Sequence, residues 1–144
     1  HVDSHQTRSY QVILVDSSVW IDFFNGASNT AVDRLEALLS DSSSTLATAD
    51  LVVFEVLRGF RSSRLLVDAQ ELLSELTQVE LGGLANALQA ADHYRELRPL
   101  GYSIRSPIDV LLASYCITHG HLLLHRDADF DVMAALRGLQ VMQH

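Results

Sequence analysis

The chain has 144 residues, the usual size of a single domain, and its hydrophobic content of 48% is enough for one core. A formal net charge of −8 argues against nucleic-acid binding through bulk positive charge, although every basic residue is arginine, which recognises phosphate well. No apolar run approaches the roughly 20 residues of a membrane span. Cys116 is the only cysteine, so an internal disulfide is excluded and a reducing, cytoplasmic location is expected.

The beginning of the chain differs from the rest. It is polar, does not begin with Met and lacks the apolar centre of a signal peptide. We therefore expect residues 1–11 to be a disordered segment or one added for expression, and residues 12–144 to form the domain.

Strand-like and helical patterns alternate along residues 12–144. Apolar, β-branched runs predict strands at residues 12–15, 45–49, 77–81, 121–124 and 139–142. Apolar residues with helical spacing fill the intervals, most clearly at residues 31–39, 65–76 and 84–97. Strands that alternate with helices imply βαβ crossovers. We therefore predict an α/β fold of three layers, with roughly five parallel strands between two layers of helices.

Four carboxylates fall where such a fold would bring them to one edge of the sheet. Asp16 follows the first strand, Asp127 follows the fourth, Asp109 lies in the first turn of a helix, and Glu55 lies in an apolar helix. Ligands bind at the carboxyl ends of the strands in open α/β sheets, so we expect these acids to cluster there. A set of hard oxygen ligands suits Mg²⁺ or Mn²⁺, and two such ions can drive phosphoryl chemistry.

Two of these acids also have a purely structural interpretation as helix caps. Asp16 is a favourable N-cap for the helix that follows it. Asp109 stands three residues after Ser106, with Pro107 between them at the first helical position, which is close to a capping box. Taken singly, Asp109 fits the capping interpretation better than the catalytic one.

The other two acids have alternatives as well. The neighbours of Glu55 leave little polar face, so its helix is expected to be buried, and a buried carboxylate needs either Arg58 or a metal as its partner. Asp127 is alternatively part of a turn in which Asp129 caps the last helix.

Other site chemistries fit the sequence less well. A calcium loop at Asp127 is excluded because its sixth and twelfth positions are Val132 and Gly138 instead of Gly and Glu. Receiver domains and haloacid-dehalogenase-like phosphatases use a site lysine, and this chain has none. A zinc site stays open as an alternative on side chains with irregular spacing, namely Cys116, His119, His121 and His125.

Four short motifs follow one another along the chain. Residues 13–22 read as a strand that ends in an acid, and residues 55–59 have the pattern Glu-x-Leu-x-Gly. Residues 105–113 and 124–130 carry the third and fourth acids. In order and spacing, over residues 12–142, these motifs resemble the PIN-domain ribonucleases, and specifically the VapC-type toxins of bacterial toxin–antitoxin pairs.

This resemblance implies a PIN-like fold over residues 12–144 and an endonuclease that depends on Mg²⁺ or Mn²⁺. It implies cleavage of structured RNA such as tRNA or rRNA, translational arrest, a homodimer, and a cognate VapB-type antitoxin that blocks the site. One departure is the pair His125-Arg126, where many family members have Thr-Asn before the fourth acid.

The expected site combines both lines of reasoning. Asp16, Asp109 and Asp127 are direct or water-mediated metal ligands, and Glu55 completes the set. The supporting side chains that we expect are Ser17, Ser18 and Asp129 for orienting ligands or water, and Arg105 and Arg126 for contacting RNA phosphates.

Two other functions stay open. A non-catalytic RNA- or protein-binding module on the same fold would lack one or more of the acids, and none is missing here. A metal-dependent DNA nuclease or phosphatase is not separated from a ribonuclease by any residue, because no motif reads a 2′-hydroxyl. The choice of RNA therefore rests on the resemblance.

Overall fold

The computed structural model describes residues 11–144, which form a five-stranded sheet covered by helices. Every neighbouring pair of strands is parallel, in the order β3-β2-β1-β4-β5. The strands are β1 (Val12–Val15), β2 (Thr45–Ala49), β3 (Thr77–Val79), β4 (Leu122–Leu124) and β5 (Gln140–Val141). The predicted parallel α/β fold is confirmed.

Three strands are shorter than the sequence pattern predicts, and local hydrogen bonds explain two of them. The backbone N–H of Leu81 donates to the Asp50 carboxylate at 2.8 Å, so Leu81 is buried beyond the end of β3. The N–H of His121 donates to the carbonyl of Cys116 at 2.9 Å. That bond closes the preceding helix through Gly120, whose φ of 68° is left-handed, and delays the start of β4.

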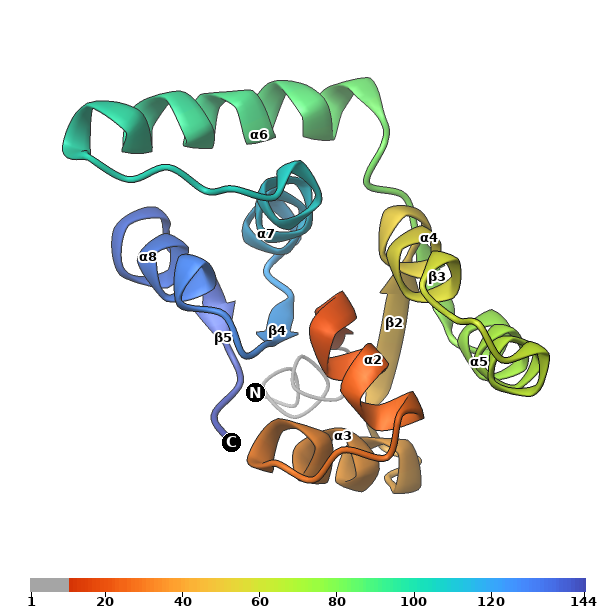
Figure 1. Ribbon diagram of the computed structural model, residues 1–144. Helices are drawn as coiled ribbons and strands as arrows, with labels where there is room; N and C mark the ends of the chain where they lie inside the picture. The colour runs from red at the N-terminus through yellow and green to blue at the C-terminus, as the bar shows by residue number, and fades with distance from the viewer. Residues whose placement is uncertain (1–10) are drawn as a thin grey trace.

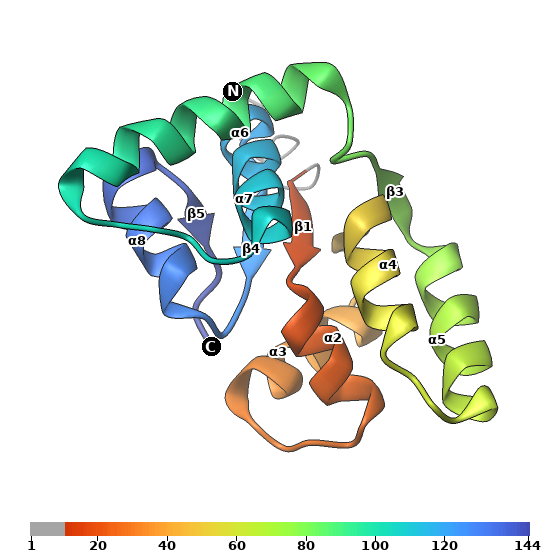
Figure 2. The same cartoon turned by 45° about the horizontal axis from the view of Figure 1, so that its top comes forward.

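The sheet lies between two layers of helices (Figures 1 and 2). One layer holds α2 (Ser17–Phe24), α3 (Thr30–Ser40), α4 (Asp50–Arg58) and α5 (Ser63–Glu75). The other holds α6 (Leu84–Leu97), the short 3-10 helix η1 (Arg98–Leu100), α7 (Pro107–His119) and α8 (Ala128–Arg137). In Figure 1, α6 is the outermost helix and crosses over α7.

The core is built on the central strands. Leu14 and Val15 of β1 and Leu123 and Leu124 of β4 are fully buried, as expected for strands covered on both faces. The indole of Trp20 is also fully buried and stacks on Phe24 at a centroid distance of 5.9 Å, which fixes α2 against the sheet.

The connections of β1 to its neighbouring strands determine where a binding crevice forms. The chain moves from β1 to β2 on one side, and later returns across β1 to β4 on the other side. Such a switch in direction opens a crevice at the carboxyl ends of the two strands. There the N–H of Asp16 donates to the carbonyl of Leu124 at 2.9 Å, so the ends of β1 and β4 are held together.

Two expectations concern the limits of the chain. The expectation for residues 1–11 falls on residues 1–10, which lie outside the described residues, and on Gln11. None of the helices between residues 11 and 144 is long and apolar enough to cross a membrane.

Candidate active site

Asp16 lies in the turn from β1 to α2 and is only 4% exposed. It holds the N-cap position of α2, but its side chain makes no capping hydrogen bond. Its Oδ2 instead accepts a hydrogen bond from the hydroxyl of Ser18. Burial raises the pKa of Asp16 above its ordinary value, against the opposing effect of the hydrogen bond from Ser18, and the charge of Glu55 raises it further. The capping interpretation therefore holds for the backbone position and not for the carboxylate.

Glu55 is tied to α2. The hydroxyl of Ser17 donates to its Oε1 at 2.7 Å. The expected alternative, an ion pair with Arg58, is not found among the described residues; the Arg58 guanidinium lies over the ring of Phe54, 5.4 Å from its centroid. The expectation that this helix is buried nearly all round is wrong, because Phe54 is 55% exposed and α4 buries only one face.

Asp109 lies in the first turn of α7. The hydroxyl of Ser106 accepts its backbone N–H at 3.4 Å, and Pro107 occupies the start of the helix, as the sequence predicts. Within residues 11–144 the Asp109 carboxylate accepts no hydrogen bond from the backbone N–H of Ser106, so the capping box is half formed. Burial raises the pKa of Asp109 to about 7, with further contributions from Asp16, Glu55 and other nearby acids.

The charges of four other acids contribute, after burial, to the raised pKa of Asp109. The acids that raise it, in order of effect, are Asp16, Glu55, Asp127 and Asp129. They come from the end of β1, from α4 and from the start of α8, so segments far apart in the sequence meet at one edge of the sheet.

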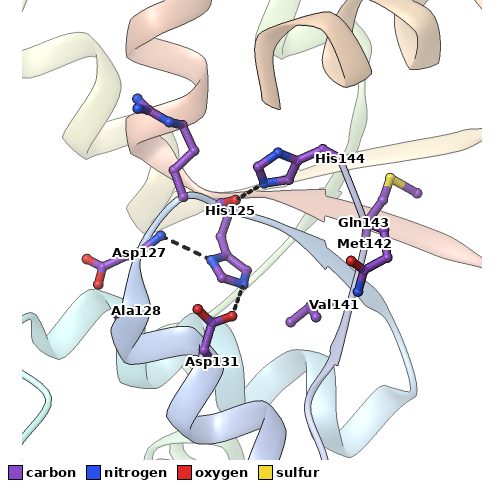
Figure 3. A pocket seen from close by; sticks show the side chains of 9 residues that line it. His125, Asp127, Ala128, Asp131, Val141, Met142, Gln143 and His144 are labelled. Atoms are coloured by element: carbon purple, nitrogen blue, oxygen red, sulfur yellow. Dashed lines mark hydrogen bonds and ion pairs between the residues drawn. The ribbon is translucent and has the colours of Figure 1, made fainter. Parts of the chain in front are cut away.

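Asp127 follows β4 and begins α8. Its Oδ1 accepts the N–H of Asp129 at 2.9 Å, so Asp127 is the N-cap of α8, and the expectation that Asp129 caps this helix is wrong. The N–H of Asp127 donates to Nδ1 of His125 at 3.1 Å. Figure 3 shows the His125 ring between that N–H and the carboxylate of Asp131, whose Oδ1 lies 3.5 Å from Nε2.

His125 is buried, and it helps to hold the turn that carries Asp127. Burial lowers the pKa of His125, while the charge of Asp131 acts in the opposite direction. The ring is then neutral near pH 7, which suits Nδ1 as an acceptor. A cavity of about 330 Å³ opens beside His125 and Asp131 and extends to His144.

The two arginines expected to contact phosphate differ in their surroundings. Arg126 forms an ion pair with Asp22 of α2, whose carboxylate also accepts from Asn29 at 3.3 Å. A phosphate at Arg126 would therefore compete with Asp22. Arg105 is exposed and directly precedes Ser106, the cap of α7.

Comparisons with known proteins identify the family. A family model for the PIN domain matches residues 13–136. The chain belongs to the PIN-domain family. A VapC ribonuclease of Mycobacterium bovis is 32% identical over 129 residues, which cover 90% of this chain and 96% of that relative. Ribonuclease VapC11 of Mycobacterium tuberculosis gives the same values, so this PIN-domain chain is a member of the VapC ribonucleases.

Solved structures share the fold of this PIN domain. A DNA-bound VapBC complex from Salmonella typhimurium superposes with a TM-score of 0.71 at 15% identity, covering 92% of this chain and 97% of that chain. VapC20 of Mycobacterium tuberculosis, described as a sarcin-ricin loop cleaving toxin, superposes with a TM-score of 0.66 at 17% identity, covering 83% and 93%. At these identities the likeness shows a common fold.

PIN-domain ribonucleases depend in general on a divalent metal. The predicted ligands fit such an ion because they are all carboxylates, whose oxygens suit a hard divalent cation. Their mutual repulsion, which adds to the effect of burial on the pKa of Asp109, would be relieved by a cation. As the side chains stand, no three His, Cys, Asp or Glu residues within 11–144 lie close enough to hold a metal ion. The acids that would hold it are Asp16, Glu55, Asp109 and Asp127.

The zinc alternative receives no support. Burial raises the pKa of Cys116 to about 12, which opposes the thiolate that zinc requires. His121 precedes β4 and His125 follows it, so neither lies within the strand. His119 packs its ring against Tyr115 at a centroid distance of 4.1 Å.

Sequence reasoning missed two acids near this edge. Asp50 directly follows β2, the same signal that selected Asp16, but its carboxylate accepts the N–H of Leu81 and ties the start of α4 to the segment after β3. Asp22 is the partner of Arg126, and no local pattern joins residues 104 positions apart in the chain.

Proposed function

We propose that this PIN-domain protein is a metal-dependent endoribonuclease toxin that cleaves cellular RNA, such as tRNA or rRNA, and thereby arrests translation. The observation that carries the proposal is the raised pKa of Asp109, which burial, and after it the charges of the neighbouring acids, bring to about 7. The ribonuclease names of relatives that are 32% identical support RNA over DNA as the substrate. All four expected acids are present, which favours an enzyme over a non-catalytic binding module.

Each acid has a role in this proposal. Asp16, Asp109 and Asp127 bind Mg²⁺ or Mn²⁺, and Glu55 completes the set. A cation held by these acids would supply the Lewis acidity needed to activate a water and to neutralise charge on the leaving oxygen.

The neighbouring side chains hold these acids in place. The hydroxyl of Ser17 donates a hydrogen bond to Glu55, and the hydroxyl of Ser18 donates one to Asp16. Both carboxylates are therefore held in fixed orientations. Asp127 uses Oδ1 to cap α8, so Oδ2 is the oxygen that it would offer to a cation. Asp129 adds negative charge beside Asp109.

The partners follow from the relatives. VapBC complexes from several bacteria contain a toxin of this fold together with its antitoxin. We therefore expect a cognate VapB-type antitoxin that blocks the acidic edge, a homodimer, and action in the cytoplasm, where the RNA substrates are.

The test is cleavage-site mapping on total cellular RNA with Mg²⁺ or Mn²⁺, with and without chelator. We expect discrete cuts that vanish with chelator and with Asp16→Asn. The matched control is Asp33→Asn, which removes an exposed acid from the first turn of α3 and should cut as the parent does. Identical cuts from Asp16→Asn and the parent, or cuts that persist in chelator, would disprove the proposal.

A further inference from the structure

A groove of about 480 Å³ runs between α6 and α7. Its walls are largely apolar and come from alanines of α6 and from Ile104, Val110 and Leu111, with the half-buried ring of Tyr94 among them. Two arginines, Arg95 and Arg105, line the same groove. An aromatic ring and apolar walls beside two cations form an environment for a flat, hydrophobic group that carries negative charge next to it.

The groove lies against a basic stretch in an otherwise acidic protein. Residues 95–105 contain three arginines and a single acid, Glu96, in a chain whose net charge is −8. Arg95, Arg98 and Arg105 are all exposed. Local positive charge of this kind attracts a polyanion to one place on a surface that otherwise repels it.

The groove and the acidic site lie on opposite faces of the same helical turn. Pro107, Val110 and Leu111 line the groove. Asp109 lies about 200° around the helix from Pro107, since successive residues are about 100° apart. A helix with its side chains is roughly 10 Å across, so an RNA strand that reaches from the groove to Asp109 must pass around the first turn of α7.

We propose that the groove between α6 and α7 binds an unpaired nucleotide of the RNA substrate beside the cleaved bond, with its base against Tyr94 and the adjoining phosphates at Arg95 and Arg105. This inference rests on the proposed ribonuclease function and adds a requirement to it. A base inside a duplex is stacked and paired, so the substrate must be single-stranded next to the cleavage site.

The first experiment measures binding of a short fluorescent single-stranded RNA, and of the same RNA as a duplex, to the full chain in chelator. Tyr94→Leu should weaken single-strand binding about 10-fold, and Tyr94→Phe, which keeps the ring, should bind as the parent does. Arg95→Gln with Arg105→Gln should weaken binding and reduce the salt dependence by about two counterions. The control Arg64→Gln, an exposed arginine on α5, should change neither.

The second experiment measures cleavage with metal. The groove variants should raise KM while kcat stays near the parent value, because the groove holds RNA and does not touch the reacting phosphate. The thermal midpoint of each variant is measured alongside; if Tyr94→Leu does not fold, the paired arginine variant decides the outcome.

Three results overturn the groove assignment. The first is that the variants bind single-stranded RNA as the parent does. The second is that the duplex binds as well as the single strand does, with the same dependence on Tyr94. The third is that the variants change only the association state in sedimentation, which would make the groove a protein interface. If the parent cleaves no RNA with metal, the proposed function itself fails; if the parent cleaves and the groove variants behave like it, only the groove assignment fails.

Discussion

Asp109 is the residue at which the electrostatics of the site can be measured. Its pKa rises from 3.8 to about 7, chiefly through burial and then through the neighbouring acids. Between these two values the unfolded chain ionises while the folded chain stays protonated, so the contribution of this group to stability falls as the pH rises. Below about pH 4 and above about pH 7 its contribution no longer changes with pH.

Replacing Asp109 should therefore have opposite effects on stability and activity. In metal-free buffer near pH 8, Asp109→Asn should be more stable than the parent by on the order of 1–2 kcal/mol, a value reduced for solvent screening at this half-buried group. The gain should disappear near pH 4, and cleavage should be abolished. Denaturant midpoints across this pH range, with RNA cleavage in metal, check both expectations.

The control for this prediction is Asp33→Asn, which also removes an acid from a first helical turn but lies exposed on α3. It should give no pH-dependent gain. A fully active Asp109→Asn enzyme would show that Asp109 serves the helix start alone.

Ser17 tests the orientation of Glu55. Ser17→Ala removes the 2.7 Å hydrogen bond to Oε1 and should lower cleavage about 10-fold with little change in unfolding midpoint. The control is Ser40→Ala, an exposed serine whose hydroxyl donates to the Glu36 carbonyl. Equal cleavage by Ser17→Ala and the parent would mean that Glu55 needs no hydroxyl to hold it.

At the scale of elements, a partly buried hydrogen bond joins α6 to α8. Nε of Arg137 donates to Nδ1 of His93 at 3.0 Å, and His93 is 7% exposed. This bond requires neutral His93, and the pKa of His93 is lowered by burial and by the charge of Arg137, with Asp92 acting in the opposite direction. The contact therefore stabilises the fold fully above the unfolded pKa of 6.5, and its contribution is lost as the pH falls below that value.

His93→Asn should reduce this acid sensitivity, because the Asn carbonyl also accepts from Arg137 and does not titrate. Between about pH 8 and pH 5 the unfolding midpoint should fall less in the variant than in the parent. The exposed Gln89 of the same helix, replaced by Asn, serves as the control and should leave the slope unchanged. Parallel pH profiles for parent and His93→Asn would mean that other groups, such as His125, account for the acid sensitivity.

For the whole molecule, the acids at the sheet edge link folding to metal. They come from the first, middle and last parts of the chain, so an ion that binds all of them stabilises the native state alone. Millimolar Mg²⁺ or Mn²⁺ should raise the thermal midpoint by several degrees. The free energy of unfolding rises by about 2.7 kcal/mol when the ion concentration is 100 times its dissociation constant. Asp16→Asn should lose most of this rise and Asp33→Asn should keep it; a midpoint unmoved by metal and by chelator alike would mean that the cluster binds no ion.

The helix starts show how far local sequence reasoning reaches. Ser106 and Pro107 predicted the start of α7, and the structure places both in those roles. At the last helix the same reasoning offered Asp129 as an alternative cap, whereas Asp127 is the cap. Both residues suit a cap chemically, and the choice depends on where β4 ends, which its pairing with β1 and β5 decides.

The sequence by itself determined the alternation of strands and helices, the parallel sheet and the acids at the strand ends, because periodicity and strand-to-helix turns are local properties of the chain. Only the tertiary structure decided which polar groups meet: Ser17 with Glu55, Arg126 with Asp22, and His93 with Arg137. It also decided the protonation of Asp109, whose pKa depends on burial and on charges brought from distant segments. These pairings are long-range contacts set by how the layers pack, and the same local pattern is compatible with many partners.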